Sequence, residues 1–245
     1  MIEQPKLLGR VALITGAGKR LGHHIALRLA SEGADIAAHY GKSAGDAEEV
    51  VAEVEKFGRR AAAFHAELTD VAAIRNLVSQ VIAHFARLDI LINSAANFLQ
   101  TKFAETPEST WDASLNTNLR APFFLSQAAA PHLAKSGHGA IINFSDIGGL
   151  VGWREFLPHS ISKAGIIMMT RVLAKELGPA VRVNALAPGT ITMPGDPPEW
   201  QQDFIEHSPL RRSGRPDEIT DAILFLLTAE FVTGHTLIID GGRTL

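Results

Sequence analysis

Short apolar runs alternate with segments of helical spacing along the whole chain, and this alternation constrains the fold more than any other feature. The runs are rich in aliphatic and β-branched residues, which is typical of strands. We expect strands at 11–15, 34–40, 61–65, 90–93, 141–144, 181–186 and 236–240, and helices at 21–31, 44–57, 71–85, 108–135, 160–177 and 216–227. The alternation predicts an α/β fold with a doubly wound parallel sheet, which binds its ligands at the carboxyl ends of the strands.

The chain has the length and composition of one such domain. Its 245 residues are 46% hydrophobic, and neither a linker nor an internal repeat interrupts them. We therefore expect residues 1–245 to form a single domain. The segment 190–212 departs from the alternation, because it holds four prolines together with Trp200, Phe204 and Ile205. We expect it to be a loop that covers the substrate as a lid.

Composition argues against several classes of function. The formal net charge is −3 with both signs interspersed, so there is no basic stripe of the kind that binds nucleic acid. The chain has no cysteine, and its ten histidines show no metal-ligand spacing. No apolar segment reaches the roughly 18 residues that a membrane span requires, and the first residues lack the apolar region of a signal peptide. We expect a cytoplasmic protein that binds a small molecule, without metal, nucleic acid or membrane.

A glycine-rich turn follows the first expected strand. Gly16, Gly18 and Gly22 stand between that strand and the helix at 21–31. Glycines here let the backbone approach a pyrophosphate without a Cβ in the way, and free N–H groups at the start of a helix attract its negative charge. Because the turn lies in a strand–helix–strand unit of the expected length, it predicts a dinucleotide site.

The end of the second expected strand indicates which dinucleotide binds. A carboxylate there binds the ribose hydroxyls of NAD(H), whereas basic residues accommodate the 2′-phosphate of NADP(H). No carboxylate occurs there before Asp46, and the residues of this strand end and of the glycine turn are His39, Tyr40, Lys42, Ser43, Lys19 and Arg20. Because Lys and Arg pair with a phosphate, the pattern favours NADPH and NADP+, although solvated turn residues would also explain it.

Three groups that can move protons follow the fifth expected strand. Asp146 lies in a glycine-containing loop, and His159 and Lys163 stand four positions apart on the next helix. Residues with this spacing share a helix face, so a carboxylate, an imidazole and an ammonium can meet in one cleft. Such a grouping suits acid–base chemistry. Taken alone, the grouping is better explained by an exposed lysine, a loop aspartate and a helix histidine that occur together by chance.

Further residues at the same edge are candidates for ligand contacts. Glu67 lies where an adenine amino group could be met, and the small residues 93–95 would let a ribose or nicotinamide lie close. Phe98 follows at the mouth of the expected cleft. Asn116 and Asn118 are poor helix-interior residues, so we expect one of them to make a local hydrogen bond or to mark a functional kink.

These motifs resemble those of the short-chain dehydrogenase/reductases along nearly the whole chain. The matching residues are Thr15, Gly16, Gly22, Asn93, Ser94, Ala95, Asn118, Lys163, Pro188, Gly189, Asp240, Gly241 and Gly242. The resemblance implies a Rossmann-type sheet of about seven strands in the order 3-2-1-4-5-6-7, a nicotinamide cofactor and a homotetramer. It also implies a catalytic set of Asn, Ser, Tyr and Lys.

Within this family the chain resembles the pteridine reductases and dihydromonapterin reductases. As in that branch, Arg20 replaces a glycine, Asp146 stands at the position of the catalytic Ser, and Phe98 matches an aromatic residue that stacks a pterin. Ser94 departs from the family by replacing a second Asn. His159 departs more seriously, because it stands where the family has its catalytic Tyr. No shift of the alignment supplies that residue, since the single tyrosine of the chain lies far away in the sequence.

The resemblance assigns roles to individual residues. The expected catalytic residues are Asn118, Asp146, His159 and Lys163, and the expected substrate contacts are Arg20, Phe98, Asp146, Trp153 and His159. The expected cofactor contacts are Gly16, Gly18, Lys19, Arg20, Leu21, His39, Tyr40, Lys42, Ser43, Glu67, Leu68, Asn93, Ser94, Ala95, Lys163, Pro188, Gly189 and Ile191.

We therefore expect an NADPH-dependent reductase of a C=N or C=O bond, with a pterin or dihydrofolate-like substrate. Asp146 and His159 would share the role of the acid. One alternative is a general ketone or 3-oxoacyl reductase, because Trp153 and Trp200 could line a pocket for another aromatic or carbonyl compound. A second alternative is an NADP(H)-binding sensor or partner subunit without turnover, because His159 replaces the Tyr.

Overall fold

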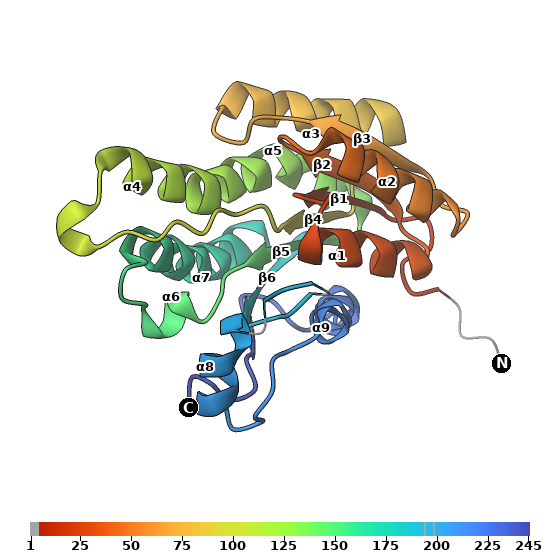
Figure 1. Cartoon of the computed structure of the whole chain (residues 1–245). Coiled ribbons are helices and arrows are strands. Elements are labelled where there is room, and N and C mark those ends of the chain that lie inside the picture. The colour runs from red at the N-terminus through yellow and green to blue at the C-terminus, as the bar shows by residue number, and fades with distance from the viewer. Residues whose placement is uncertain (1–4, 194, 198) are drawn as a thin grey trace.

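Seven parallel strands form one sheet in the order β3-β2-β1-β4-β5-β6-β7, as predicted (Figure 1). The computed structural model describes residues 5–193, 195–197 and 199–245. The strands are β1 (Val11–Thr15), β2 (Asp35–Tyr40), β3 (Ala61–His65), β4 (Ile90–Asn93), β5 (Gly139–Phe144), β6 (Val181–Pro188) and β7 (Thr236–Ile239). The chain adds strands outward from β1 to β3 and then returns to place β4 on the other side of β1. This reversal leaves a crevice at the carboxyl ends of β1 and β4.

Helices cover both faces of the sheet (Figure 1). One face carries α1 (Arg20–Ser31), α2 (Ala44–Glu55) and α9 (Pro216–Thr228), and the other carries α3 (Val71–Phe85), α5 (Ala121–Ser136) and α7 (Leu157–Leu177). Successive residues of a strand point to opposite faces, so a strand covered on both sides must be apolar throughout. Leu13 and Ile14 of β1 illustrate this, because both are fully buried, each in a different one of the two cores.

The helix expected at 108–135 is divided into three parts. The α-helix α4 (Glu108–Leu115) leads into a π-helical turn (Asn116–Arg120), and α5 follows. A π-turn widens the helix locally and often occurs at functional sites. Asn118 is buried in this turn, and its side chain makes hydrogen bonds outside the helix. The expected kink therefore lies at this asparagine.

The segment 190–212 is not a continuous loop, so that expectation is wrong for its centre. It contains α8 (Glu199–His207), which buries Phe204 against Gly189. Prolines weaken a helix only within its interior, and the prolines of this segment stand before or after α8. Pro194, Pro198 and the side chain of Trp200 lie outside the described residues.

Two short helices occupy other expected loops: the 3-10 helix η1 (Phe103–Glu105) and α6 (Gly148–Val151), which follows Asp146. In the described ranges, no helix combines the length and the hydropathy that a membrane span needs. The same residues contain no cluster of three or more His, Asp or Glu side chains placed to hold a metal ion.

Candidate active site

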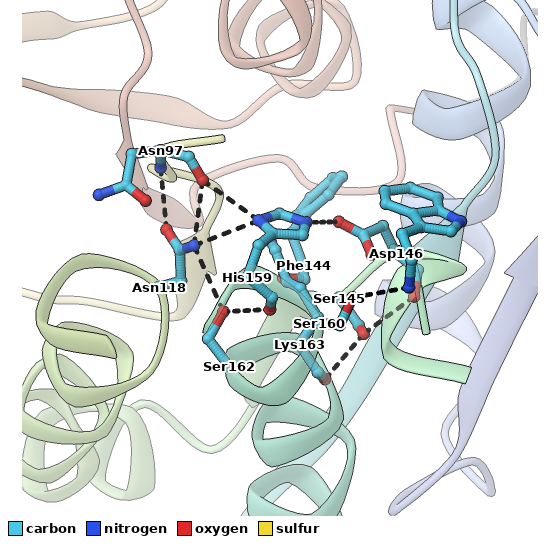
Figure 2. A network of polar contacts seen from close by, with 10 residues as sticks. Asn97, Asn118, Phe144, Ser145, Asp146, His159, Ser160, Ser162 and Lys163 are labelled. Carbon is cyan, nitrogen blue, oxygen red and sulfur yellow. Dashed lines mark hydrogen bonds and ion pairs between the residues drawn. The ribbon is translucent and has the colours of Figure 1, made fainter. Parts of the chain in front are cut away.

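Asp146 and His159 meet at the carboxyl edge of the sheet (Figure 2). Asp146 lies two residues beyond the end of β5, and His159 lies in the first turn of α7. Asp146 Oδ2 is 2.7 Å from His159 Nε2. The side chain of His159 is 3% exposed and that of Asp146 is 17% exposed. The imidazole is therefore enclosed, and the carboxylate is the more exposed member of the pair.

Both ring nitrogens of His159 face hydrogen-bond acceptors. Nε2 faces the Asp146 carboxylate, and Nδ1 lies 3.3 Å from the backbone carbonyl oxygen of Asn97. A neutral imidazole has one N–H group and satisfies one acceptor, whereas an imidazolium donates to both. Nδ1 also lies 3.5 Å from the amide nitrogen of Asn118, so it has both an acceptor and a donor beside it. The second carboxylate oxygen, Asp146 Oδ1, is buried and has no hydrogen-bond partner among the described residues.

The π-helical turn brings Asn118 against Asn97 (Figure 2). Asn118 Oδ1 accepts a hydrogen bond from the backbone N–H of Asn97 at 2.8 Å, and its Nδ2 donates to the Asn97 carbonyl oxygen at 3.0 Å. The same Nδ2 approaches Ser162 Oγ at 3.3 Å and His159 Nδ1 at 3.5 Å. Asn118 therefore fixes the loop after β4 against α7 and orients the carbonyl that faces the imidazole. Sequence reasoning did not identify Asn97 or Ser162, because neither belongs to a motif.

Lys163 lies close to the pair but bonds elsewhere. Its Nζ donates to the carbonyl oxygen of Phe144 at 2.9 Å, and the residue is 4% exposed. Burial lowers the pKa of Lys163, and the negative charge of Asp146 partly opposes that effect. An ammonium has three donors, so one hydrogen bond among the described residues leaves two for a ligand.

Two aromatic rings pack against His159, and a third packs against them. The ring of Phe98 meets the imidazole edge to face, with centroids 4.7 Å apart, and Trp153 lies nearly parallel to it at 6.1 Å. Phe156 stacks on Phe98 at 4.3 Å. Phe98 remains 58% exposed, so its ring forms an apolar wall beside the Asp146–His159 pair. The sequence pointed to Phe98 and Trp153 but not to Phe156, since an aromatic residue before a helix carries no functional signal.

The glycine turn between β1 and α1 fits a dinucleotide phosphate. Gly16 has a φ of +68°, and a Cβ on Gly22 would lie 2.0 Å from the Gly16 carbonyl oxygen. The turn is therefore closed so tightly that only glycine fits at position 22. Lys19, the N-cap residue of α1, provides no side-chain cap, so the first N–H groups of the helix are left for an anion. Leu21 packs its side chain against the core, which leaves its backbone for the turn.

The two basic residues of the turn are paired with carboxylates. Arg20 occupies a left-handed conformation, with a φ of 50°, and its guanidinium binds Asp196 through two hydrogen bonds of 2.7 and 3.0 Å. Lys19 Nζ lies 3.0 Å from Asp46. Both cations were expected to be available to a 2′-phosphate, and no local pattern in the sequence indicates these partners.

Lys42 and Ser43 differ from these paired cations. Within the described ranges, neither side chain has a hydrogen bond or an ion pair, although both stand directly after β2. Ser43 is the N-cap residue of α2 and leaves the first N–H groups of that helix uncapped. Among the residues expected at the 2′-phosphate end, these two are therefore the ones whose polar atoms are free.

His39 supports the glycine turn from behind. The residue is 2% exposed, its Nδ1 accepts a hydrogen bond from the Gly16 N–H at 3.2 Å, and its Nε2 donates to the Ala66 carbonyl oxygen at 3.1 Å. Burial lowers the pKa of His39, which keeps the ring neutral as this pattern requires. Its imidazole therefore holds the ends of β1 and β3 together and does not face the crevice. Tyr40, the next residue, is half-buried and its ring lies 5.5 Å from that of His65.

The loop after β3 is ordered by Glu67. Its carboxylate accepts hydrogen bonds from the Thr69 backbone N–H at 3.0 Å and from the Thr69 hydroxyl at 2.9 Å. The Thr69 backbone bond is the main reason why the pKa of Glu67 is lowered. Leu68 is 7% exposed and packs in the core. Both hydrogen bonds from Thr69 go to Oε1 of Glu67. The expected adenine contact is therefore left to the other carboxylate oxygen and to the backbone of the loop.

The end of β4 contacts the glycine turn directly. Thr15 Oγ1 accepts hydrogen bonds from the backbone N–H groups of Ser94 and Ala95, both at 3.0 Å. A Cβ on Gly16 would lie 3.2 Å from the Ala95 Cα. Asn93 points away into the protein, where its amide donates to Asn143 Oδ1 at 2.8 Å. The small residues after β4 therefore serve the close approach of two backbones.

The end of β6 closes the other side of the site. Pro188 accepts a hydrogen bond from the backbone N–H of Ile147 at 3.2 Å, which ties the strand to the loop that carries Asp146. Gly189 follows, and Ile191 forms an isolated parallel bridge with Gly214. The segment that was expected to be a lid therefore starts beside the Asp146 loop.

Comparisons with known proteins agree with this architecture. Residues 16–244 match the family model described as enoyl-(acyl carrier protein) reductase. The chain is 35% identical to the 3-oxoacyl-(acyl-carrier-protein) reductase FabG of Thermotoga maritima, over 98% of this chain and 100% of the relative. It is 33% identical to the 3-oxoacyl-(acyl-carrier-protein) reductase of Synechocystis, over 98% of each chain.

Solved structures show the same likeness. A short-chain dehydrogenase of Burkholderia cenocepacia, crystallised with NADP, superposes with a TM-score of 0.92 at 35% identity, covering 98% of this chain and 100% of the other. A blue fluorescent protein from a metagenomic library, crystallised with NADPH, superposes with a TM-score of 0.92 at 33% identity and the same coverage. Because sequence and fold agree over nearly the full length, the chain belongs to the short-chain dehydrogenase/reductase family.

Proposed function

We propose that this protein is an NADPH-dependent reductase of a polarised C=O or C=N bond. The observation that supports the proposal is the Asp146–His159 hydrogen bond of 2.7 Å, which joins an imidazole and a carboxylate at the carboxyl edge of the sheet. The glycine turn lies at the same edge, and its tight closure suits the phosphates of a dinucleotide. NADP and NADPH occur in the solved relatives named above, which supports the choice of cofactor.

When bound, NADPH supplies a hydride to the carbon atom of the double bond, and the protein must supply a proton to the oxygen or nitrogen atom. We assign this proton to His159 Nε2, which shares it with Asp146, the more exposed member of the pair. A substrate heteroatom that reaches this pair takes the proton, and Asp146 stabilises the positive imidazole before the transfer. The Asn97 carbonyl and Asn118 keep the ring in register with the carboxylate.

Lys163 and the loop residues would hold the cofactor. The two free donors of the Lys163 ammonium suit ribose hydroxyls, and Lys42 and Ser43 suit the 2′-phosphate, since their side chains have no partner in the described part of the chain. Arg20 joins them only if it leaves Asp196. Glu67, Ser94, Ala95, Pro188 and Gly189 border the crevice through their backbone.

The substrate class that the relatives favour is a ketone or a 3-oxoacyl thioester, because the curated relatives named above are 3-oxoacyl reductases. A pterin or dihydrofolate-like compound is the second candidate. The exposed ring of Phe98 beside the proton donor favours it, since a flat heterocycle can stack there.

Purified protein should be mixed with NADPH and with each of four probes: 7,8-dihydropterin, dihydrofolate, a 3-oxoacyl thioester and a simple aromatic ketone. We expect oxidation of NADPH with at least one carbonyl probe. His159→Phe serves as the matched variant, because it keeps the aromatic packing and removes both ring nitrogens. Tight NADPH binding without turnover for any probe would contradict the reductase and would support a sensor or partner subunit. In that case His159→Tyr should create activity.

Exposed apolar side chains on α5 and α7 support assembly into a homotetramer. Phe123 of α5 and Met168 and Val172 of α7 are 41%, 56% and 48% exposed. Burial of such residues between chains would remove apolar surface from water. Light scattering measures the mass of the assembly directly.

We also propose that the segment 190–212 moves as a lid in a cytoplasmic enzyme, with α8 as its rigid part.

A further inference from the structure

A cavity of about 710 Å³ lies at the amino ends of the strands, at the edge of the sheet opposite the Asp146–His159 pair. It is bordered by the segment before β1, the starts of β5 and β6, and the end of α9. Its charged and titratable lining residues are Lys6, Arg10, His138, Arg182 and Glu230. None of the expected contacts with cofactor or substrate lies in this region.

Arg182 forms the fixed part of the lining. Its guanidinium donates to the backbone carbonyl oxygens of Leu226, Leu227, Ala229 and Val232, at 2.6 to 3.3 Å. These residues lie at the end of α9 and just beyond it. A cation at the carboxyl end of a helix satisfies the orphan carbonyls there and interacts favourably with the helix dipole. The position of this positive charge is therefore set by the fold.

Arg10 places a second guanidinium beside the first. In the part of the chain that the structure describes, the side chain of Arg10 makes no hydrogen bond and no ion pair. Burial lowers the pKa of Arg182, the charge of Arg10 lowers it further, and Glu230 opposes both effects. Two like charges that face one cavity repel each other, and an anion between them would remove that repulsion.

We propose that this cavity is a binding site for a phosphate-bearing small molecule. Arg10 and Arg182, without Lys6, carry two positive charges against the single carboxylate of Glu230 in the lining, which leaves an excess of one even with His138 neutral. A guanidinium binds phosphate oxygens through two parallel hydrogen bonds, and Arg10 can make them, whereas Arg182, held by backbone carbonyls, contributes its charge. The cavity has the volume of a small-molecule pocket, roughly 300–1,000 Å³, so the phosphate carries an organic body about the size of a nucleotide.

Inorganic pyrophosphate is the probe, titrated into the full chain by calorimetry with NADP+ in excess so that the glycine turn is occupied. We expect saturable binding to the wild-type protein and affinity at least tenfold weaker for Arg10→Gln. Arg59→Gln is the matched control, because Arg59 also lies at the amino edge, just before β3, and does not line the cavity. Its affinity for pyrophosphate should equal that of the wild type.

A second variant tests the same charge argument from the other side. Glu230→Gln removes the one carboxylate of the lining at an exposed position, so it should bind pyrophosphate several-fold more tightly than the wild type. Thermal unfolding without ligand should show no loss of stability in Arg10→Gln, because the substitution removes a like-charge contact. Absence of pyrophosphate binding to the wild type, or binding that neither Arg10→Gln nor Glu230→Gln alters, would overturn the proposal.

Discussion

Replacement of Asp146 by Asn tests the proposed proton donor most directly. The substitution keeps the shape of the side chain and one oxygen acceptor, but it removes the negative charge that faces His159 Nε2 at 2.7 Å. With an effective dielectric constant of about 20, two unit charges at this distance attract each other by roughly 6 kcal/mol. Desolvation of both groups offsets most of that attraction. The net value of a hydrogen bond to a charged group is about 1.5–3 kcal/mol.

This net value predicts the kinetic effect. Each 1.4 kcal/mol corresponds to roughly a tenfold change in rate, so kcat of Asp146→Asn should fall by about 10-fold to 100-fold. The affinity for NADPH should change little, because the structure gives Asp146 no part in the glycine turn. Initial rates of NADPH oxidation and a separate measurement of NADPH binding by fluorescence would distinguish the two effects.

Asp70→Asn is the control with the same chemical change. Asp70 is the N-cap residue of α3, where its Oδ1 accepts from the Ala72 N–H at 2.8 Å, and Asn caps a helix as well as Asp does. Its kcat should equal that of the wild type. If Asp146→Asn retained kcat within about twofold of the wild type while Asp70→Asn did the same, the charge of Asp146 would have no role in proton transfer.

Three further variants test the remainder of the site. Gly22→Ala should abolish NADPH binding and lower the free energy of unfolding by about 3 kcal/mol, because its Cβ would collide with the backbone. The control Gly45→Ala has open space around the new Cβ and should not destabilise the protein. Equal melting temperatures for the two variants would refute this reasoning. Burial lowers the pKa of Lys163 below its ordinary 10.5, so the unfolded chain binds more protons between the two values and the free energy of unfolding rises with pH there. In urea unfolding, Lys163→Met should lack that rise. An unchanged slope of the free energy of unfolding against pH would show that Lys163 is not its source. Asp196→Asn frees Arg20 and should tighten NADPH binding several-fold without a change in melting temperature, and weaker binding would show that the pair assists the cofactor.

The sequence by itself determined the sheet and the place of the site. Strand and helix periods are local properties, and a strand covered on both faces must be apolar along its length, as Leu13 and Ile14 are. Once seven strands alternate with helices, the carboxyl edge follows from topology, and the residues that end the strands must meet there. The approach of Asp146 to His159 could therefore be predicted from two segments of sequence.

The tertiary structure decided which of these side chains are available. Arg20 and Lys19 are equally good candidates for phosphate ligands in the sequence. In the structure Arg20 binds a carboxylate 176 positions away, and Lys19 pairs with Asp46. His39 has the chemistry of a ligand and lies behind the turn instead. Nothing local records such partners, because a hydrogen bond depends on the distance and direction between two atoms that only the folded chain brings together.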